Sequence, residues 1–146
     1  MTNYNRRFME LAKHVATWSK DKTTKNGTVI VNEDNIVLSV AYNGFPRDAD
    51  DEIADRYERP KKYLYTEHAE RNCINNAARI GISIKDCTMY TTMFPCVDCC
   101  KSIINSGIAM LVTPSPNFDD EQWGESFKIA LELLKECGVD IFYYNR

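Results

Sequence analysis

The chain has 146 residues, of which 44% are apolar, and its formal net charge is −3. This length suits one domain over residues 1–146, and the apolar fraction can supply a core, which argues against a disordered protein. The acidic balance disfavours nucleic-acid polymers and anionic membranes as partners, so a phosphate-bearing ligand would need a local basic pocket. The longest apolar run, at 108–112, cannot span a bilayer, and the first residues lack a signal peptide's apolar stretch. We therefore expect a cytoplasmic protein.

The first half of the chain predicts one helix, one hairpin and one long loop. Apolar residues recur at helical spacing over 5–19, which predicts a helix with one face on a sheet. Two β-rich runs, at 28–31 and 36–42, are joined by the turn-forming sequence NEDN and predict an antiparallel hairpin. Residues 45–65 show no clear period and predict a loop, and a loop this long is usually functional or mobile.

The second half predicts alternating helices and strands. A helix over 66–81 has Thr66 as a capping residue at its start and Gly81 at its end. Strands at 87–92, 109–113 and 139–144 alternate with helices at 96–106 and about 121–137. Such alternation implies parallel pairing, whereas the hairpin is antiparallel. We expect an α/β fold of three layers, α/β/α, with a five-stranded mixed sheet flanked by helices.

Two helix starts carry the residues that suggest chemistry. His68 lies two residues before Glu70 in the first turn of the 66–81 helix. Cys96 and Cys99 follow Pro95 at the start of the next helix, and their spacing places them on one face. The positive end of a helix lowers a thiol pKa, and thiolate is the form that binds metal. A catalytic zinc ion uses three protein ligands, which His68, Cys96 and Cys99 would supply.

Each motif alone has a simpler explanation. Cysteines on one helix are often merely buried, and a His or Glu at a helix start is often a cap or a packed side chain. The joint pattern is more specific, because HAE, a strand and then PCxxC form the signature of zinc-dependent nucleobase deaminases. The other four cysteines are expected to pack. Cys73, Cys87 and Cys137 lack partners at ligand spacing, and Cys100 lies directly beside the ligand pair.

With its flanking motifs, the sequence resembles the deoxycytidylate (dCMP) deaminases of the cytidine deaminase-like superfamily. The shared motifs are SKD at 19–21, YNGFP at 42–46, HAERN at 68–72 and FPCVDC at 94–99. The resemblance covers about residues 6–144 of the sequence. The chain departs from the family at Asn26-Gly27-Thr28, where V-G-A is common.

The resemblance implies zinc-dependent hydrolysis of dCMP to dUMP and ammonia, which supplies thymidylate synthesis. His68, Cys96 and Cys99 would hold one zinc ion per chain, because residues 45–65 lack the Cys and His that bind a second zinc in some members. Glu70 would carry protons between the zinc-activated water and N3 of cytosine.

The resemblance also implies how the nucleotide is held. Asn43 would bond the deoxyribose 3′-hydroxyl, and the backbone near Met93 and Phe94 would read the base edge. The 5′-phosphate would meet cations and hydroxyls in the segment after the first helix, namely Ser19, Lys20, Lys22, Thr23, Thr24 and Lys25. A solvated polar loop explains any single one of these about as well.

Family members are homo-oligomers, commonly hexamers, activated by dCTP and inhibited by dTTP at a separate site. In this chain the expected effector-binding residues are Gly44, Phe45 and Arg47, with Arg79 as a link to the active site. The acidic run that starts at Asp48 would repel a bare triphosphate, so we expect Mg²⁺ with the effector.

Three alternatives remain open from the sequence. One is a deaminase that acts on dCTP. A transfer RNA adenosine deaminase shares HAE and PCxxC, but the acidic charge and the absence of a basic C-terminal helix disfavour it. A zinc-stabilised interaction module without catalysis would need a fourth ligand, such as Cys100.

Overall fold

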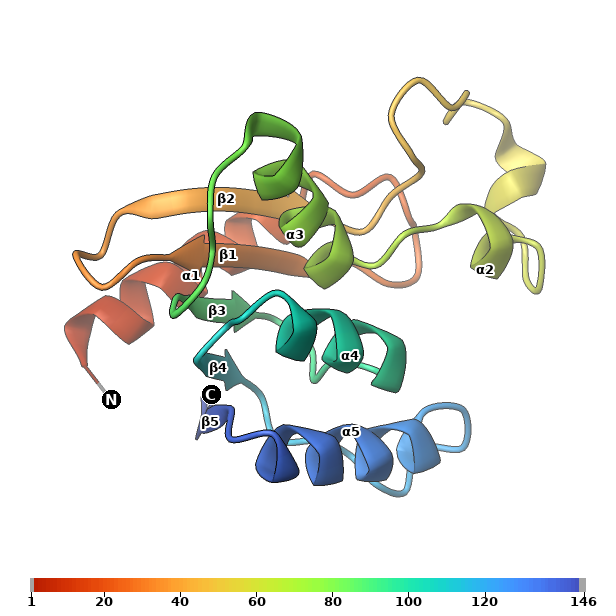
Figure 1. The fold of residues 1–146 in the computed structure, drawn as a ribbon. Coiled ribbons are helices and arrows are strands. Elements are labelled where there is room, and N and C mark those ends of the chain that lie inside the picture. Colours follow the sequence, from red (N-terminus) through yellow and green to blue (C-terminus); the bar gives the residue numbers. More distant parts are fainter. Residues whose placement is uncertain (1, 145–146) are drawn as a thin grey trace.

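The computed structural model describes residues 2–144 and shows a five-stranded sheet with helices on both faces (Figure 1). The strand order is β2-β1-β3-β4-β5. β1 pairs antiparallel with β2 and β3, whereas β3, β4 and β5 run parallel. The strands are β1 (Gly27–Val31), β2 (Val37–Tyr42), β3 (Thr88–Thr91), β4 (Met110–Thr113) and β5 (Asp140–Tyr143). The predicted mixed sheet is confirmed.

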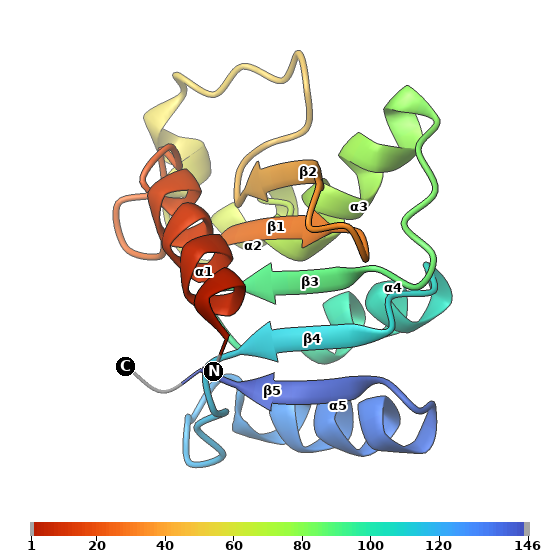
Figure 2. The same ribbon diagram turned by 90° about the vertical axis from the view of Figure 1, so that its left-hand side faces the viewer.

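The helices form two outer layers, as predicted (Figure 2). α1 (Asn3–Ala16) covers one face, and α3 (Ala69–Ile80), α4 (Val97–Asn105) and α5 (Gly124–Glu136) cover the other. Successive strand side chains point to opposite faces, so Val29 and Val31 join the core under α1 while Ile30 joins the core under the other helices. A Cβ atom at Gly27 would lie 2.0 Å from the Ala12 carbonyl oxygen. α1 can therefore approach β1 this closely only because residue 27 is glycine.

Several predicted boundaries were wrong. α3 begins at Ala69 because His68 has extended backbone and is the N-cap residue, so Thr66 does not cap it. α1 and α5 are likewise shorter than predicted. The stretch 45–65, predicted as a loop, contains a 3-10 turn η1 (Ala54–Tyr57) and a short helix α2 (Lys62–Tyr65). Phe45 packs against Tyr57 and Tyr65, with ring centroids 4.6 and 5.8 Å away. These aromatic contacts order a segment that has no sequence periodicity.

Three of the four cysteines that were expected to pack are buried. Cys73, Cys87 and Cys100 are buried as predicted, but Cys137 is exposed because it ends α5 at the surface. Within residues 2–144, every helix is too short or too polar to cross a membrane.

Candidate active site

The starts of α3 and α4 bring three potential metal ligands together. His68 caps α3 and Cys96 caps α4, while Cys99 lies in the first turn of α4. The Nδ1 atom of His68 lies 3.4 Å from the Sγ atom of Cys96 and 3.3 Å from that of Cys99. All three ligand atoms lie within 4.8 Å of one another. Residues far apart in the chain therefore form one triangle, as the sequence predicts.

This triangle has the dimensions of a zinc site. Zn–N and Zn–S bonds in a tetrahedral site place ligand atoms roughly 3.5 to 3.8 Å apart, close to the distances seen here. Cys100 lies outside the triangle, because its thiol contacts the backbone oxygen of Ala130 at 3.3 Å. Among the described residues, His, Cys, Asp and Glu side chains supply three ligands and no fourth. Three protein ligands with one open position are typical of a catalytic zinc ion, whereas structural zinc sites have four.

The thiols share one hydrogen bond. A hydrogen bond from Cys99 and another from His68 lower the pKa of Cys96 to about 4, and the Cys96–Cys99 bond raises the pKa of Cys99. The hydrogen bond with Cys96 also raises the pKa of His68. Cys96 is therefore the more readily ionised thiol of the pair. Binding of zinc would release the proton of any ligand thiol that still holds one, because thiolate is the metal-binding form.

Glu70 lies beside this triangle and is 2% exposed. Burial raises the pKa of its carboxyl group, because the charged form is poorly solvated. Its Oε1 atom accepts hydrogen bonds from Asn26 Nδ2 at 3.2 Å and Thr91 Oγ1 at 3.3 Å. Its Oε2 atom is buried and has no hydrogen-bond partner among the described residues. One carboxylate oxygen is thus held by the protein, and the other is available to a ligand.

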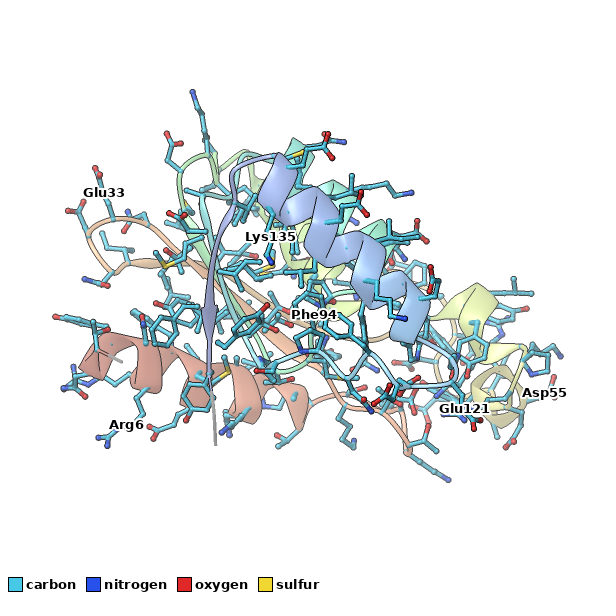
Figure 3. All side chains as sticks on the ribbon, turned by 90° about the horizontal axis from the view of Figure 1, so that it is seen from below. Arg6, Glu33, Asp55, Phe94, Glu121 and Lys135 are labelled. Carbon is cyan, nitrogen blue, oxygen red and sulfur yellow. The ribbon has the colours of Figure 1, made fainter. Side chains whose placement is uncertain are left out.

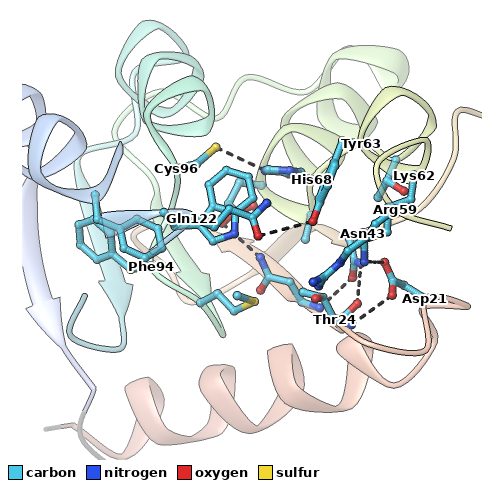
Figure 4. A pocket seen from close by; sticks show the side chains of 17 residues that line it. Asp21, Thr24, Asn43, Arg59, Lys62, Tyr63, His68, Phe94, Cys96 and Gln122 are labelled. Atoms are coloured by element: carbon cyan, nitrogen blue, oxygen red, sulfur yellow. Dashed lines mark hydrogen bonds and ion pairs between the residues drawn. The ribbon is translucent and has the colours of Figure 1, made fainter. Parts of the chain in front are cut away.

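A pocket of about 100 Å³ adjoins Glu70 and two of the potential metal ligands, His68 and Cys96 (Figure 4). We call it the reaction pocket; its lining includes His68, Glu70, Cys96, Asn43, Phe94 and Arg59. Phe94 lies close to α5 (Figure 3). Its ring packs edge-on against Phe127 of that helix, with ring centroids 5.5 Å apart. The far wall comes from α2 and the start of α5, where Tyr63 Oη donates to Gln122 Oε1 at 3.5 Å. Segments from four parts of the chain therefore enclose the pocket.

The structure brings some of the expected substrate residues to the reaction pocket. Asn43, Thr24, Met93 and Phe94 line it. Asn43 also supports the backbone, since its Nδ2 donates to Thr24 O and its Oδ1 accepts from Asn26 N, both at 2.8 Å. The Nδ2 and Oδ1 atoms of Asn43 therefore each keep one unused hydrogen-bonding position for a ligand.

The structure does not bring the expected phosphate-binding lysines to this pocket. Lys20 is exposed and forms ion pairs with Asp51 and Glu52. Lys25 donates to the Ser19 carbonyl oxygen, while Ser19 itself is buried and donates to Asn43 O at 2.8 Å. Thr23 bonds to Asp21 and Lys62 and does not line the pocket.

A buried ion pair instead occupies this wall, and no motif in the sequence indicated it. Lys62 Nζ lies 2.9 Å from Asp21 Oδ2, and each side chain is 6% exposed. Burial by itself would raise the pKa of Asp21, but hydrogen bonds from Lys62, Thr23 and Thr24 hold it below its usual value. The ion pair links α2, through Lys62, to the segment after α1, through Asp21. Because Lys62 is already paired, it is not a free cation for a ligand.

Arg59 is a cation of the reaction pocket that the sequence reasoning missed. It is exposed, lines the pocket and forms no ion pair with any acid within 2–144 (Figure 4). It lies in the stretch that showed no periodicity, so nothing local distinguished it from Lys20. Only the path of residues 45–65 across the pocket reveals it.

A second, larger hollow of about 520 Å³ lies over β2 and α3. We call it the outer cavity; its lining includes Trp18, Gly44, Phe45, Arg47, Asp48 and Arg79. The four expected effector residues are therefore gathered here. Of the acidic run 48–52, Asp48 lines the cavity, while Asp51 and Glu52 pair with Lys20. The negative charge near the cavity is thus lower than the sequence suggested.

The two hollows share a wall. Gly44 and Glu67 form a two-residue β-bridge, with N–O distances of 3.1 and 2.8 Å. Gly44 and Glu67 line the outer cavity, whereas their chain neighbours Asn43 and His68 line the reaction pocket. A ligand in one hollow would therefore contact residues whose direct neighbours in the chain line the other hollow.

Comparison with known proteins agrees with this geometry. A family model described as "Cytidine and deoxycytidylate deaminase zinc-binding region" matches residues 2–114. The chain belongs to this family. The deaminase is 37% identical over 142 residues to an uncharacterized deaminase in the luxG 3′ region of Aliivibrio fischeri, covering 97% of this chain and 93% of the relative. It is 35% identical over 131 residues to the deoxycytidylate deaminase of Homo sapiens, covering 86% of this chain and 72% of the relative.

A solved structure shares the fold of this deaminase. The crystal structure of a dCMP deaminase from the cyanophage S-TIM5, in complex with dCMP and dUMP, matches it with a TM-score of 0.78. The two chains are 22% identical, and the match covers 99% of each. The cytidine deaminase-like fold expected from the sequence is therefore confirmed.

Proposed function

We propose that this deaminase converts dCMP and water to dUMP and ammonia. The observation that carries the proposal is the free, buried Oε2 atom of Glu70 beside a triangle of three zinc ligands. A buried carboxylate with one unpartnered oxygen next to an open metal position can accept and return protons. The names of the similar deoxycytidylate deaminases support cytosine nucleotides as the substrates.

In this mechanism His68, Cys96 and Cys99 would hold a zinc ion, which would lower the pKa of water enough to supply hydroxide near neutral pH. Glu70 Oε2 takes the proton of the attacking water, while a C–O bond forms at C4 of cytosine. Glu70 then delivers this proton to ring N3. The proton of the new C4 hydroxyl group passes to the amino nitrogen, so that the C4–N bond breaks, ammonia leaves and the C4 carbonyl of dUMP forms. The raised pKa of Glu70 suits this role, because the carboxyl must hold a proton between the two steps.

The reaction pocket offers groups for each part of the nucleotide. Asn43 retains hydrogen-bonding capacity for the 3′-hydroxyl of deoxyribose, and the backbone near Met93 and Phe94 can read the base edge. Arg59 replaces the lysines as our choice for the 5′-phosphate, since a guanidinium group binds phosphate through paired donors. Thr24 remains a phosphate candidate because it lines the same pocket.

The charge of the pocket lining favours the monophosphate over dCTP. Arg59 is its one lining cation without an ion pair inside the described chain, which suits a monophosphate better than the larger charge of a triphosphate.

We also propose regulation at the outer cavity by dCTP as activator and dTTP as inhibitor, each with Mg²⁺. Arg47 and Arg79 supply positive charge, Phe45 an aromatic ring, and Asp48 a carboxylate for the metal ion. The shared wall of Gly44 and Glu67 gives a physical route to the reaction pocket. Trp18 and Tyr42 are 49% and 39% exposed beside this cavity, which supports burial against a neighbouring subunit. The family resemblance supports a hexamer, working in the cytoplasm.

One assay tests the proposed function. Zinc content is measured together with ammonia release from dCMP, dCTP, deoxycytidine and a transfer RNA anticodon stem. We expect about one zinc per chain, the highest kcat/KM for dCMP and a much lower one for deoxycytidine. Preference for dCTP, or equal efficiency on dCMP and deoxycytidine, would contradict the substrate. Zinc binding without any ammonia release would favour an interaction module.

A further inference from the structure

A cluster of buried and half-buried polar side chains adjoins the reaction pocket through Asn26. It comprises Asn26, Thr28, Thr91 and Thr92, from β1, β3 and the residues that flank them. Asn26 is 6% exposed, while Thr28 and Thr91 are fully buried. Buried amides and hydroxyls destabilise a core unless they form hydrogen bonds, so this cluster must be internally matched. Asn26 lines the reaction pocket, whereas the three threonines do not.

The cluster fixes Asn26 in one orientation. The Oδ1 atom of Asn26 accepts from Thr92 Oγ1 at 2.7 Å and lies 3.3 Å from Thr91 Oγ1. Its Nδ2 atom donates to Glu70 Oε1 at 3.2 Å. A rotated amide would place Oδ1 against the carboxylate oxygen, where two acceptors would repel each other. The backbone N–H of Asn26 also donates to Asn43 Oδ1, so the main chain is held as well.

This arrangement makes the two oxygens of Glu70 unequal. Oε1 lies within hydrogen-bonding distance of Asn26 Nδ2 and Thr91 Oγ1, whereas Oε2 has no partner among the described residues. Thr28 Oγ1 lies 3.2 Å from Thr91 Oγ1 and forms no hydrogen bond with Glu70 among the described residues. Because Oε1 already accepts hydrogen bonds, a proton on it would face other donors, so the proton of this carboxyl group is placed on Oε2. We infer that Asn26 is a positioning residue that holds Glu70 through Oε1, so that Oε2 carries the proton between water and cytosine N3.

This inference rests on the proposed function, so the test measures both together. Asn26→Leu removes the amide but keeps a similar branched shape, and Asn26→Asp keeps the shape but replaces the donor with an acceptor. Thr28→Val is the matched control, because it removes a hydroxyl from the same buried cluster without touching Glu70. For each zinc-loaded variant, kcat and KM for dCMP, zinc content and thermal unfolding are measured.

We expect both Asn26 variants to lower kcat about 10- to 100-fold, to change KM less than about threefold and to retain about one zinc per chain. Thr28→Val is expected to keep kcat within about threefold of the wild type. If Asn26→Leu does not fold, the isosteric Asn26→Asp variant decides. An active wild type with unchanged kcat in the Asn26 variants, or an equal loss in Thr28→Val, overturns the inference alone. A wild type that releases no ammonia from dCMP overturns the proposed function and the inference together.

Discussion

The reaction pocket and the outer cavity lie on either side of the Gly44–Glu67 bridge, but their polar groups are held differently. In the reaction pocket, Glu70 and Asn43 are almost fully buried and bonded to the protein. In the outer cavity, Arg47 is exposed, and its bond to Asn76 Oδ1 at 2.7 Å lies at the surface. Preorganised buried groups suit chemistry, because they need not reorganise during the reaction. Exposed side chains suit a site that is completed by its ligand or by another subunit.

The largest effect is expected for the zinc ligands of the reaction pocket. His68→Ala, Cys96→Ser and Cys99→Ser should lose zinc and nearly all ammonia release, because each removes one of three protein ligands. Metal analysis and the dCMP assay measure the two losses. Cys100→Ser is the control, since its thiol points to Ala130 and lies outside the ligand triangle. A Cys99→Ser protein that retained zinc and activity would show that the triangle is not the metal site.

The buried ion pair behind the reaction pocket gives the next prediction. Lys62→Met should lower the free energy of unfolding by about 3 kcal/mol at neutral pH, because it leaves Asp21 buried without its partner. Lys61→Met is the matched control: Lys61 pairs with Asp55 at the surface, where the cost should stay below about 1 kcal/mol. Denaturant unfolding measures both variants. Equal losses would mean that burial of the Asp21–Lys62 pair has no special effect.

The same pair predicts a dependence on pH. The pKa of Asp21 is lower in the folded state than in the unfolded state, near 4, so its ionised form stabilises the fold above that value. This contribution disappears as the pH falls through the folded-state pKa. The difference in unfolding free energy between the wild type and Lys62→Met should therefore be largest at neutral pH and shrink at acid pH. A difference that grew on acidification would contradict this explanation.

A smaller effect, on kcat/KM, is expected to distinguish Arg59 in the reaction pocket from Lys20 outside it. Arg59→Ala should lower kcat/KM for dCMP about 10- to 100-fold but leave that for deoxycytidine nearly unchanged, because the nucleoside lacks the phosphate. Lys20→Ala should change neither value strongly, since Lys20 pairs with Asp51 and Glu52 away from the pocket. Steady-state kinetics on both substrates measure the contrast. The reverse result would restore the lysine assignment made from the sequence.

The smallest effect is expected in the outer cavity. Arg79→Ala should weaken activation by dCTP with Mg²⁺ less than tenfold, which corresponds to under about 1.4 kcal/mol of coupling. Saturation curves for dCMP at several dCTP and dTTP concentrations measure the shift. Arg6→Ala on α1 is a matched surface control, because Arg6 pairs only with Glu10 there. A hyperbolic wild-type curve unmoved by either nucleotide, from a protein that sediments as a monomer, would remove the regulatory role.

The local features of this protein could be predicted from its sequence. The strands follow short β-rich runs, and their ends match the structure within one residue. The potential zinc ligands and Glu70 could also be predicted, because they lie in two short motifs, HAE and PCxxC, at the starts of two helices. Helix α3 was misplaced at its start because an extended His68 takes the capping position that Thr66 was expected to fill.

The features that could not be predicted from the sequence depend on contacts between segments that are distant in the chain. Lys20 and Arg59 are both cations in polar stretches, and only the folded path of 45–65 places Arg59 in the pocket and Lys20 among acids. Asn26 could be noticed as a departure from V-G-A, but its partner Glu70 lies 44 residues away in the chain. The pairing of Lys62 with Asp21 spans 41 residues. Such pairings have no local pattern in a single sequence.

The central claim is that Glu70 carries protons beside a zinc ion that it does not bind. Glu70→Gln tests this most directly, because glutamine keeps the size and the Oε1 acceptor but cannot shuttle a proton. Ammonia release from dCMP should be measured per bound zinc in the wild type and the variant. We expect full zinc content and a kcat lowered about 10²- to 10⁴-fold. A variant that loses zinc but keeps substantial activity per remaining metal ion would contradict the claim.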